Sequence, residues 1–132
     1  MSLTSIRNEL ETRLNTWANS FNPAIAVAWE GVPFQLPTDR YVEVFLLPSA
    51  TINPTVDGGR KREYGIFQVN VYVKDGKGTK QLNELVDSLV TYFPVVPKTG
   101  NVSIERTPSV SVGITMNGWR SVPVSIPYRM ES

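Results

Sequence analysis

The sequence contains neither cysteine nor histidine among its 132 residues. Without cysteine the chain has no disulfide and no thiolate nucleophile. Without histidine it lacks the usual general base at neutral pH, and both of the soft side chains that most often bind zinc are missing. These absences exclude a serine–histidine triad and the common zinc sites, so that acid–base or metal chemistry would have to rely on carboxylates.

Charge is also sparse, because charged residues make up 19% of the chain and the formal net charge is +1. Such a balance gives no electrostatic reason to expect strong binding to nucleic acid or to a membrane surface. The carboxylates are scattered, and the turn DGKGT at residues 75–79 lacks the spacing of a phosphate-binding loop. Carboxylates distant in sequence could still meet in space, but we expect no catalytic residues, no metal and no cofactor.

No run of apolar residues approaches the roughly 20 that a membrane span requires. Charged residues at positions 7, 9, 11 and 13 interrupt the segment where a signal peptide would be apolar. We therefore expect a soluble protein that is made and used inside a cell, folded as one domain over residues 1–132.

Periodicity predicts the secondary structure. Apolar residues spaced by three or four predict helices over residues 3–21 and 80–93, and alternation predicts strands over residues 24–29, 40–47, 64–73, 101–106, 109–115 and 119–129. This pattern predicts an α+β fold, namely a mostly antiparallel twisted β-sheet with two helices packed on one face.

The two central strands carry large side chains on both faces. Valines at positions 42, 44, 69, 71 and 73 point to one side, and Tyr41, Phe45, Ile66 and Tyr72 point to the other. Because two helices can cover only one face, the other would keep more apolar surface than a monomer normally exposes. We infer a subunit interface on this second face, although cover by residues 24–29 and by loops is the alternative.

Glycine and proline predict irregularities in the strands. Gly65 lies within an unusually long strand and predicts a bulge or bend. Pro123 and Pro127 have the same parity, so their missing backbone N–H groups lie along one edge of the last strand. That edge cannot form a complete ladder of hydrogen bonds. That edge is then either the outer edge of the sheet or a contact made through side chains.

Two hairpin registers are possible before the last strand. A two-residue turn would pair Met116 with Trp119 and place the apolar residues of the two strands on opposite faces. A three-residue loop with Gly118 left-handed would pair Val110 with Val124 and direct the valines of residues 109–115 inward. We predict the second register, because it buries both apolar sets.

Residues 49–61 form a polar segment, SATINPTVDGGRK, that is longer than most hairpin loops. The segment ends in the basic run Arg60-Lys61-Arg62. Three adjacent cations without an aromatic platform are weak evidence for nucleic-acid binding, and a solvated loop end is the favoured interpretation.

The order of these elements resembles that of the tail-terminator proteins of long-tailed bacteriophages, the lambda-type minor tail proteins. The segments that carry the resemblance are RYVEVFLLP, the polar loop after it, and REYGIFQVNVYVKDGKGTKQLNELVDSLVTYFP. The clearest part is residues 64–93. The resemblance implies a small α+β subunit of a homo-hexameric ring that caps the tail tube, stops its polymerisation and joins the tail to the head connector. DNA would pass through the lumen without specific binding.

The resemblance also implies the partners and the site. These would be copies of the chain itself, the tail tube protein and the head–tail connector protein, at the tail–head junction of a virion assembled in the host cytoplasm, with no membrane. Asp57, Arg60, Lys61 and Arg62 would make contacts between subunits or with the tube. Two alternatives remain: a neck or head-completion ring protein, and a small cellular ligand-binding α+β domain.

The basic end of the loop generates a first prediction. Reversing the charge of Arg60 and Arg62 to glutamate should leave the subunit folded but abolish rings and tail-length control, because these residues lie in a polar loop outside the expected core. Light scattering and electron microscopy of tails measure the outcome. Unchanged rings would remove these residues from the interface.

Overall fold

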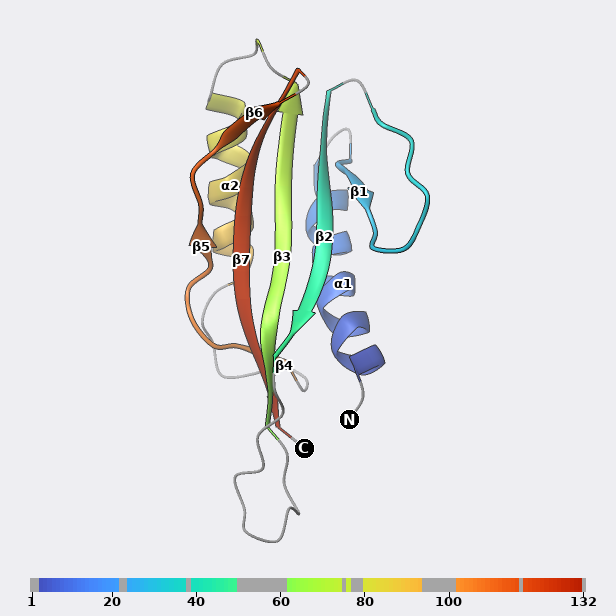
Figure 1. The fold of residues 1–132 in the computed structure, drawn as a ribbon, viewed down its shortest axis with the longest axis vertical. Coiled ribbons are helices and arrows are strands. Elements are labelled where there is room, and N and C mark those ends of the chain that lie inside the picture. Colours follow the sequence, from blue (N-terminus) through green and yellow to red (C-terminus); the bar gives the residue numbers. More distant parts are fainter. Residues whose placement is uncertain are drawn as a thin grey trace, which may run out of the picture.

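The computed structural model describes residues 3–21, 24–37, 39–49, 62–74, 76, 80–93, 102–116 and 118–131. The chain runs through α1 (Leu3–Asn19), β1 (Ala26–Ala28), β2 (Arg40–Pro48), β3 (Arg62–Lys74), α2 (Lys80–Tyr92), β4 (Val102–Ile104), β5 (Ser109–Val110), β6 (Ile114–Met116) and β7 (Trp119–Glu131) (Figure 1). The predicted α+β class is confirmed, and each predicted helix and strand is present within a few residues of its expected bounds except the strand over residues 109–115, which is divided into β5 and β6.

The strands form one sheet in the order β1-β2-β3-β7-β4, and β5 and β6 also pair with β7. Only β1 and β2 run parallel, and the other described pairs are antiparallel. The centre of the sheet is the pair β3–β7, which is continuous from Arg62 opposite Glu131 to Lys74 opposite Trp119.

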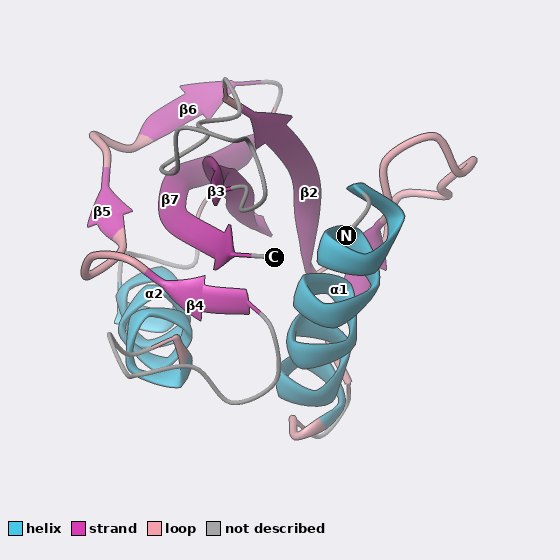
Figure 2. Ribbon diagram, turned by 90° about the horizontal axis from the view of Figure 1, so that it is seen from below, coloured by secondary structure: helices cyan, strands magenta, loops and turns pink. Residues whose placement is uncertain are grey.

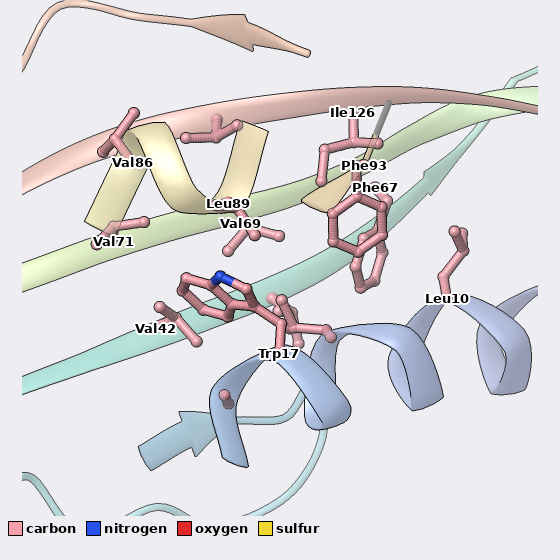
Figure 3. Packing of buried hydrophobic residues seen from close by; sticks show 14 of the residues in the cluster. Leu10, Trp17, Val42, Phe67, Val69, Val71, Val86, Leu89, Phe93 and Ile126 are labelled. Atoms are coloured by element: carbon pink, nitrogen blue, oxygen red, sulfur yellow. The ribbon is translucent and has the colours of Figure 1, made fainter. Parts of the chain in front are cut away.

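Both helices lie on the same side of this sheet (Figure 2). Trp17 of α1 is 1% exposed, and its indole Nε1–H donates a hydrogen bond of 3.1 Å to Ser88 Oγ of α2. Figure 3 shows the Trp17 ring over the strands, with Val42 and Leu89 nearby. This indole therefore joins the two helices to each other and to the inner face of the sheet.

The inward residues are those that alternation predicted. Val42, Val44 and Leu46 of β2, Phe67, Val69, Val71 and Val73 of β3, and Leu82, Leu85, Val86 and Leu89 of α2 are all buried in one cluster. The face opposite the helices is correspondingly made of the intervening residues.

Of the bulge or bend predicted at Gly65, the bulge is wrong. Gly65 pairs one-to-one with Pro48 on one side and with Tyr128 on the other, so no residue is inserted in either ladder. A Cβ at this position would lie 2.6 Å from Cζ of Tyr128 and 2.7 Å from the carbonyl oxygen of Leu47. Glycine is required here because the Tyr128 ring lies directly against the backbone of β3.

The predicted three-residue hairpin loop is also wrong, but the pairing of Val110 with Val124 that was predicted with it is present in β5. Met116 pairs with Trp119 across a two-residue turn in which Gly118 has φ 78°. Val110 nevertheless pairs with Val124, which is shifted by one residue. The registers of β5 and β6 on β7 therefore differ by one residue. The additional residue lies within residues 111–113, which separate β5 from β6.

This break overturns the expectation that residues 109–115 direct their apolar side chains inward. Val112 is 87% exposed, and Val110 and Ile114 are each 51% exposed. Between the two short strands the regular pairing with β7 stops, although the Ser111 N–H still bonds to Pro123, and the Val112 side chain is left exposed.

The prolines of β7 face these short strands. The carbonyl oxygen of Pro123 accepts the N–H of Ser111 at 3.0 Å, and that of Pro127 accepts the N–H of Glu105 at 2.9 Å. Because β7 lies between β3 and the short strands and bonds to them through its backbone, this edge is neither the outer edge of the sheet nor a contact made through side chains, so both predicted alternatives are wrong. The incomplete ladder predicted for this edge is confirmed, since the neighbouring chain is divided into β4, β5 and β6.

Gly65 generates a stability prediction. Gly65→Ala should lower the free energy of unfolding by about 1–3 kcal/mol, because the new methyl group overlaps the Tyr128 ring and the backbone of β2. Urea denaturation measures this change. Gly113→Ala is the matched control, since a Cβ there would meet its nearest atoms at 3.4 Å. Equal stability of the two variants would contradict the prediction.

Candidate functional site

The side of the sheet opposite the helices is called here the outer face. It comprises Tyr41, Glu43, Phe45 and Leu47 of β2, Ile66, Gln68, Asn70 and Tyr72 of β3, and Ser121, Pro123 and Ser125 of β7. Both described helices lie on the other side, so this face is covered by neither of them (Figures 1 and 2). Most of its side chains are half-buried by their own neighbours in the sheet.

One end of the outer face carries a cluster of aromatic rings, Phe34, Tyr41, Tyr72 and Trp119. Tyr41 and Tyr72 stack with ring centroids 4.5 Å apart, and Trp119 meets Tyr41 edge-on at 5.0 Å. Phe34 lies 5.3 Å from Tyr41 on its other side. Tyr41 is consequently only 9% exposed, so it supports the surrounding rings and presents little surface of its own.

The hydroxyl group of Tyr72 is held by a carboxylate. It donates a hydrogen bond of 3.1 Å to Glu43 Oε1. Burial, followed by the negative charge of Glu43, raises the pKa of Tyr72 to about 12. The phenol therefore stays protonated at neutral pH and acts as a hydrogen-bond donor, which suits a structural role and gives no general base.

A polar band crosses the middle of the outer face. Ser125 Oγ donates to Gln68 Oε1 at 2.8 Å, and Gln68 Nε2 donates to Asn70 Oδ1 at 3.0 Å. These side chains satisfy one another across β3 and β7. The face is therefore not one continuous apolar patch, because the band separates the aromatic cluster from Ile66 and Leu47 at the other end.

A groove of about 360 Å³ lies where the outer face meets the chain after β1, and is called here the edge groove. Its apolar lining comes from Trp29, Val32, Phe34, Leu36, Tyr41 and Phe45.

Glu30 fixes the turn beside the groove. It accepts the backbone N–H of Leu46 at 3.1 Å and the Arg7 guanidinium at 3.0 Å. The Leu46 N–H and then Arg7 hold the pKa of Glu30 below its ordinary value, so this carboxylate is ionised and partnered at neutral pH.

The structure distributes the predicted interface residues over different parts of this surface. Tyr41 and Tyr72 belong to the aromatic cluster, Phe45 lines the edge groove, and Ile66 lies opposite Leu47 beyond the polar band. Asp57, Arg60 and Lys61 lie outside the described residues. Arg62 is the first residue of β3, and its side chain is likewise outside the description.

Sequence reasoning missed Trp119, the polar band and the edge groove. The band had a signal, because Gln68 and Asn70 share the parity of Ile66 and Tyr72. No sequence signal could have predicted the edge groove, because residues 29–36 show no periodicity. Their conformation depends on contacts with β2 and α1.

The described residues contain no group of three or more acidic side chains placed to hold a metal ion. Neither of the two described helices is long and apolar enough to cross a membrane.

The Tyr72–Glu43 contact generates a pH prediction. The pKa of Tyr72 rises from 10.0 to about 12 on folding, so its contribution to stability is complete below pH 10 and is lost as the pH rises toward 12. In denaturation measured across this range, Tyr72→Phe should lose less stability than the unsubstituted protein. Parallel losses would show that another group is responsible, with Tyr41 and Tyr128, whose pKa values are also raised by burial, the first to test.

Comparison with known proteins agrees with this architecture. The family model for phage tail terminator proteins matches residues 5–128. A solved structure without a descriptive name, one of seven matching chains, is 31% identical and superposes with a TM-score of 0.81 over 98% of this chain and 96% of its own. A search of curated proteins gave no match. The chain therefore belongs to the phage tail terminator protein family and is a structural protein of the phage tail.

Proposed function

We propose that this protein forms a homo-hexameric ring that caps the tail tube, stops tube polymerisation and provides the surface for the head–tail connector. The role is non-enzymatic and belongs to the tail–head junction of the virion, after assembly in the host cytoplasm. Membership of the tail terminator family supports the position in the tail.

The observation that carries the proposal is the outer face. Both described helices are used to cover the inner face, and Phe45, Ile66 and the aromatic cluster remain on the other side. The two described helices cover only one face of the central strands, whereas an assembly can bury the second face against a neighbour or the tube. The charged loop residues Asp57, Arg60, Lys61 and Arg62 would set the register of those contacts.

The charge balance fits a ring through which DNA passes without being bound specifically. With a formal net charge of +1, the chain lacks the strong positive charge that phosphate binding uses. A neck or head-completion ring would share these properties, and its partner would be the portal side and not the tube end. Partner identity therefore separates the two.

The decisive experiment images the protein with and without tail tubes of the cognate phage by negative-stain electron microscopy, after size-exclusion with light scattering. Six-fold rings seated on tube ends, together with arrest of tube growth, are the expected result. A monomer indifferent to tubes would contradict the proposal, and rings that bind only the portal side would favour the neck protein.

Single substitutions on the outer face test its role. Phe45→Asp and Ile66→Asp should each keep the subunit folded, because both side chains are half-buried on the face away from the core, but should abolish capping of tube ends. Circular dichroism and a tube-elongation assay measure the two properties. Tyr92→Asp, which alters a 39% exposed ring at the end of α2, is the matched control and should cap normally.

A further inference from the structure

Two uncovered apolar features lie at opposite edges of the sheet. The first, called here the edge ridge, consists of Val112, Ile114 and Met116, which are 87%, 51% and 64% exposed. The second is the edge groove, whose rim residues Val32 and Leu36 are 55% and 58% exposed. Exposed aliphatic side chains concentrated at two sites are unusual for a chain that acts as a monomer.

The strand order separates the ridge from the groove. β1 and the chain after it form one edge, next to β2, while β6 pairs with β7 on the other side of β3 (Figure 1). The two features therefore cannot cover each other within one subunit. A contact between different patches of two identical subunits is heterologous, and repeated contacts of this kind close into a ring when the rotation permits.

The charges around the two features are complementary. Arg120 pairs with Thr115 of β6, and Lys74 pairs with Trp119, the partner of Met116, so two cations belong to the strand pairs beside the ridge. Glu30 and Glu43 both line the groove, and Arg7 pairs with Glu30, so these three side chains together carry one negative charge. Charges of opposite sign around an apolar contact orient the partners and raise the rate of encounter.

The polar groups of the groove are already engaged. Glu30 accepts hydrogen bonds from Leu46 and Arg7, and Glu43 accepts one from the Tyr72 hydroxyl. A polar small molecule would consequently find no unpartnered carboxylate there, and an apolar side chain is the occupant that suits the surface that remains.

We propose that the edge ridge of one subunit inserts into the edge groove of a second copy of this chain, and that this head-to-tail contact closes the ring. The inference rests on the ring of the proposed function and assigns its subunit contact. Phe45 lines the groove and also belongs to the outer face, so the contact is continuous with the surface already described.

Substitution of either partner surface tests the contact. Val112→Asp on the ridge and Leu36→Asp in the groove alter strongly exposed side chains, so each variant should fold and each should be monomeric by light scattering, with rings lost. An equimolar mixture of the two variants should form a one-to-one heterodimer and no larger assembly. The intact ridge of the Leu36→Asp variant can enter the intact groove of the Val112→Asp variant, and the second contact of the pair is missing. Tyr92→Asp, exposed on α2, should retain rings.

The absence of cysteine allows a second measurement. A chain carrying both Met116→Cys and Leu36→Cys, treated with a bismaleimide linker, should give a covalent ladder that ends at the size of the ring. Each single variant should give only monomers. Symmetric dimers from either single variant would show an isologous contact and would overturn the inference.

Failure of the ridge-into-groove contact and failure of the proposed function give different results. Rings of the unsubstituted protein that survive Val112→Asp and Leu36→Asp would overturn the ridge-into-groove contact and leave the proposed function standing. An unsubstituted protein that stays monomeric both alone and at tube ends would overturn both.

Discussion

β3 and β7 pair without interruption along their length, and the arrangement of the molecule depends on this ladder. In antiparallel strands with full register, side chains of one parity share one face. Once Val69 lies opposite Val124, the inner face is fixed as the apolar one and Gln68 and Ser125 are placed on the other. One pairing therefore creates both the core and the outer face that is available for assembly.

The inner face is completed by helices, and Trp17 is the side chain that joins them. Its indole is buried over the strands and bonded to Ser88, so α1 and α2 are fastened to one side of the sheet. The other side is left to the stacked tyrosines, the polar band and Phe45. The two faces therefore differ in kind, since the inner one forms the buried core with the helices and the outer one carries aromatic and polar side chains that neither described helix covers.

The edge beyond β7 is irregular for a physical reason. Pro123 and Pro127 remove two donors from that side, and the neighbouring chain pairs only in the short strands β4, β5 and β6. A discontinuous edge resists uncontrolled addition of further strands. The same discontinuity leaves Val112 outside the paired strands and its side chain exposed.

Periodicity along the chain determined the helices, the long strands, the inward valines of β2, β3 and β7 and the outward Tyr41, Phe45, Ile66 and Tyr72, because period and parity are local properties of a sequence. Only the tertiary structure decided that Tyr128 lies against Gly65, that the shift in register occurs at residues 111–113, and that Phe34 and Trp119 enclose Tyr41. These features depend on which distant strands meet and on how closely they approach. A local sequence pattern does not determine how closely two distant strands approach each other. The edge groove and the edge ridge could therefore be identified only in the folded chain.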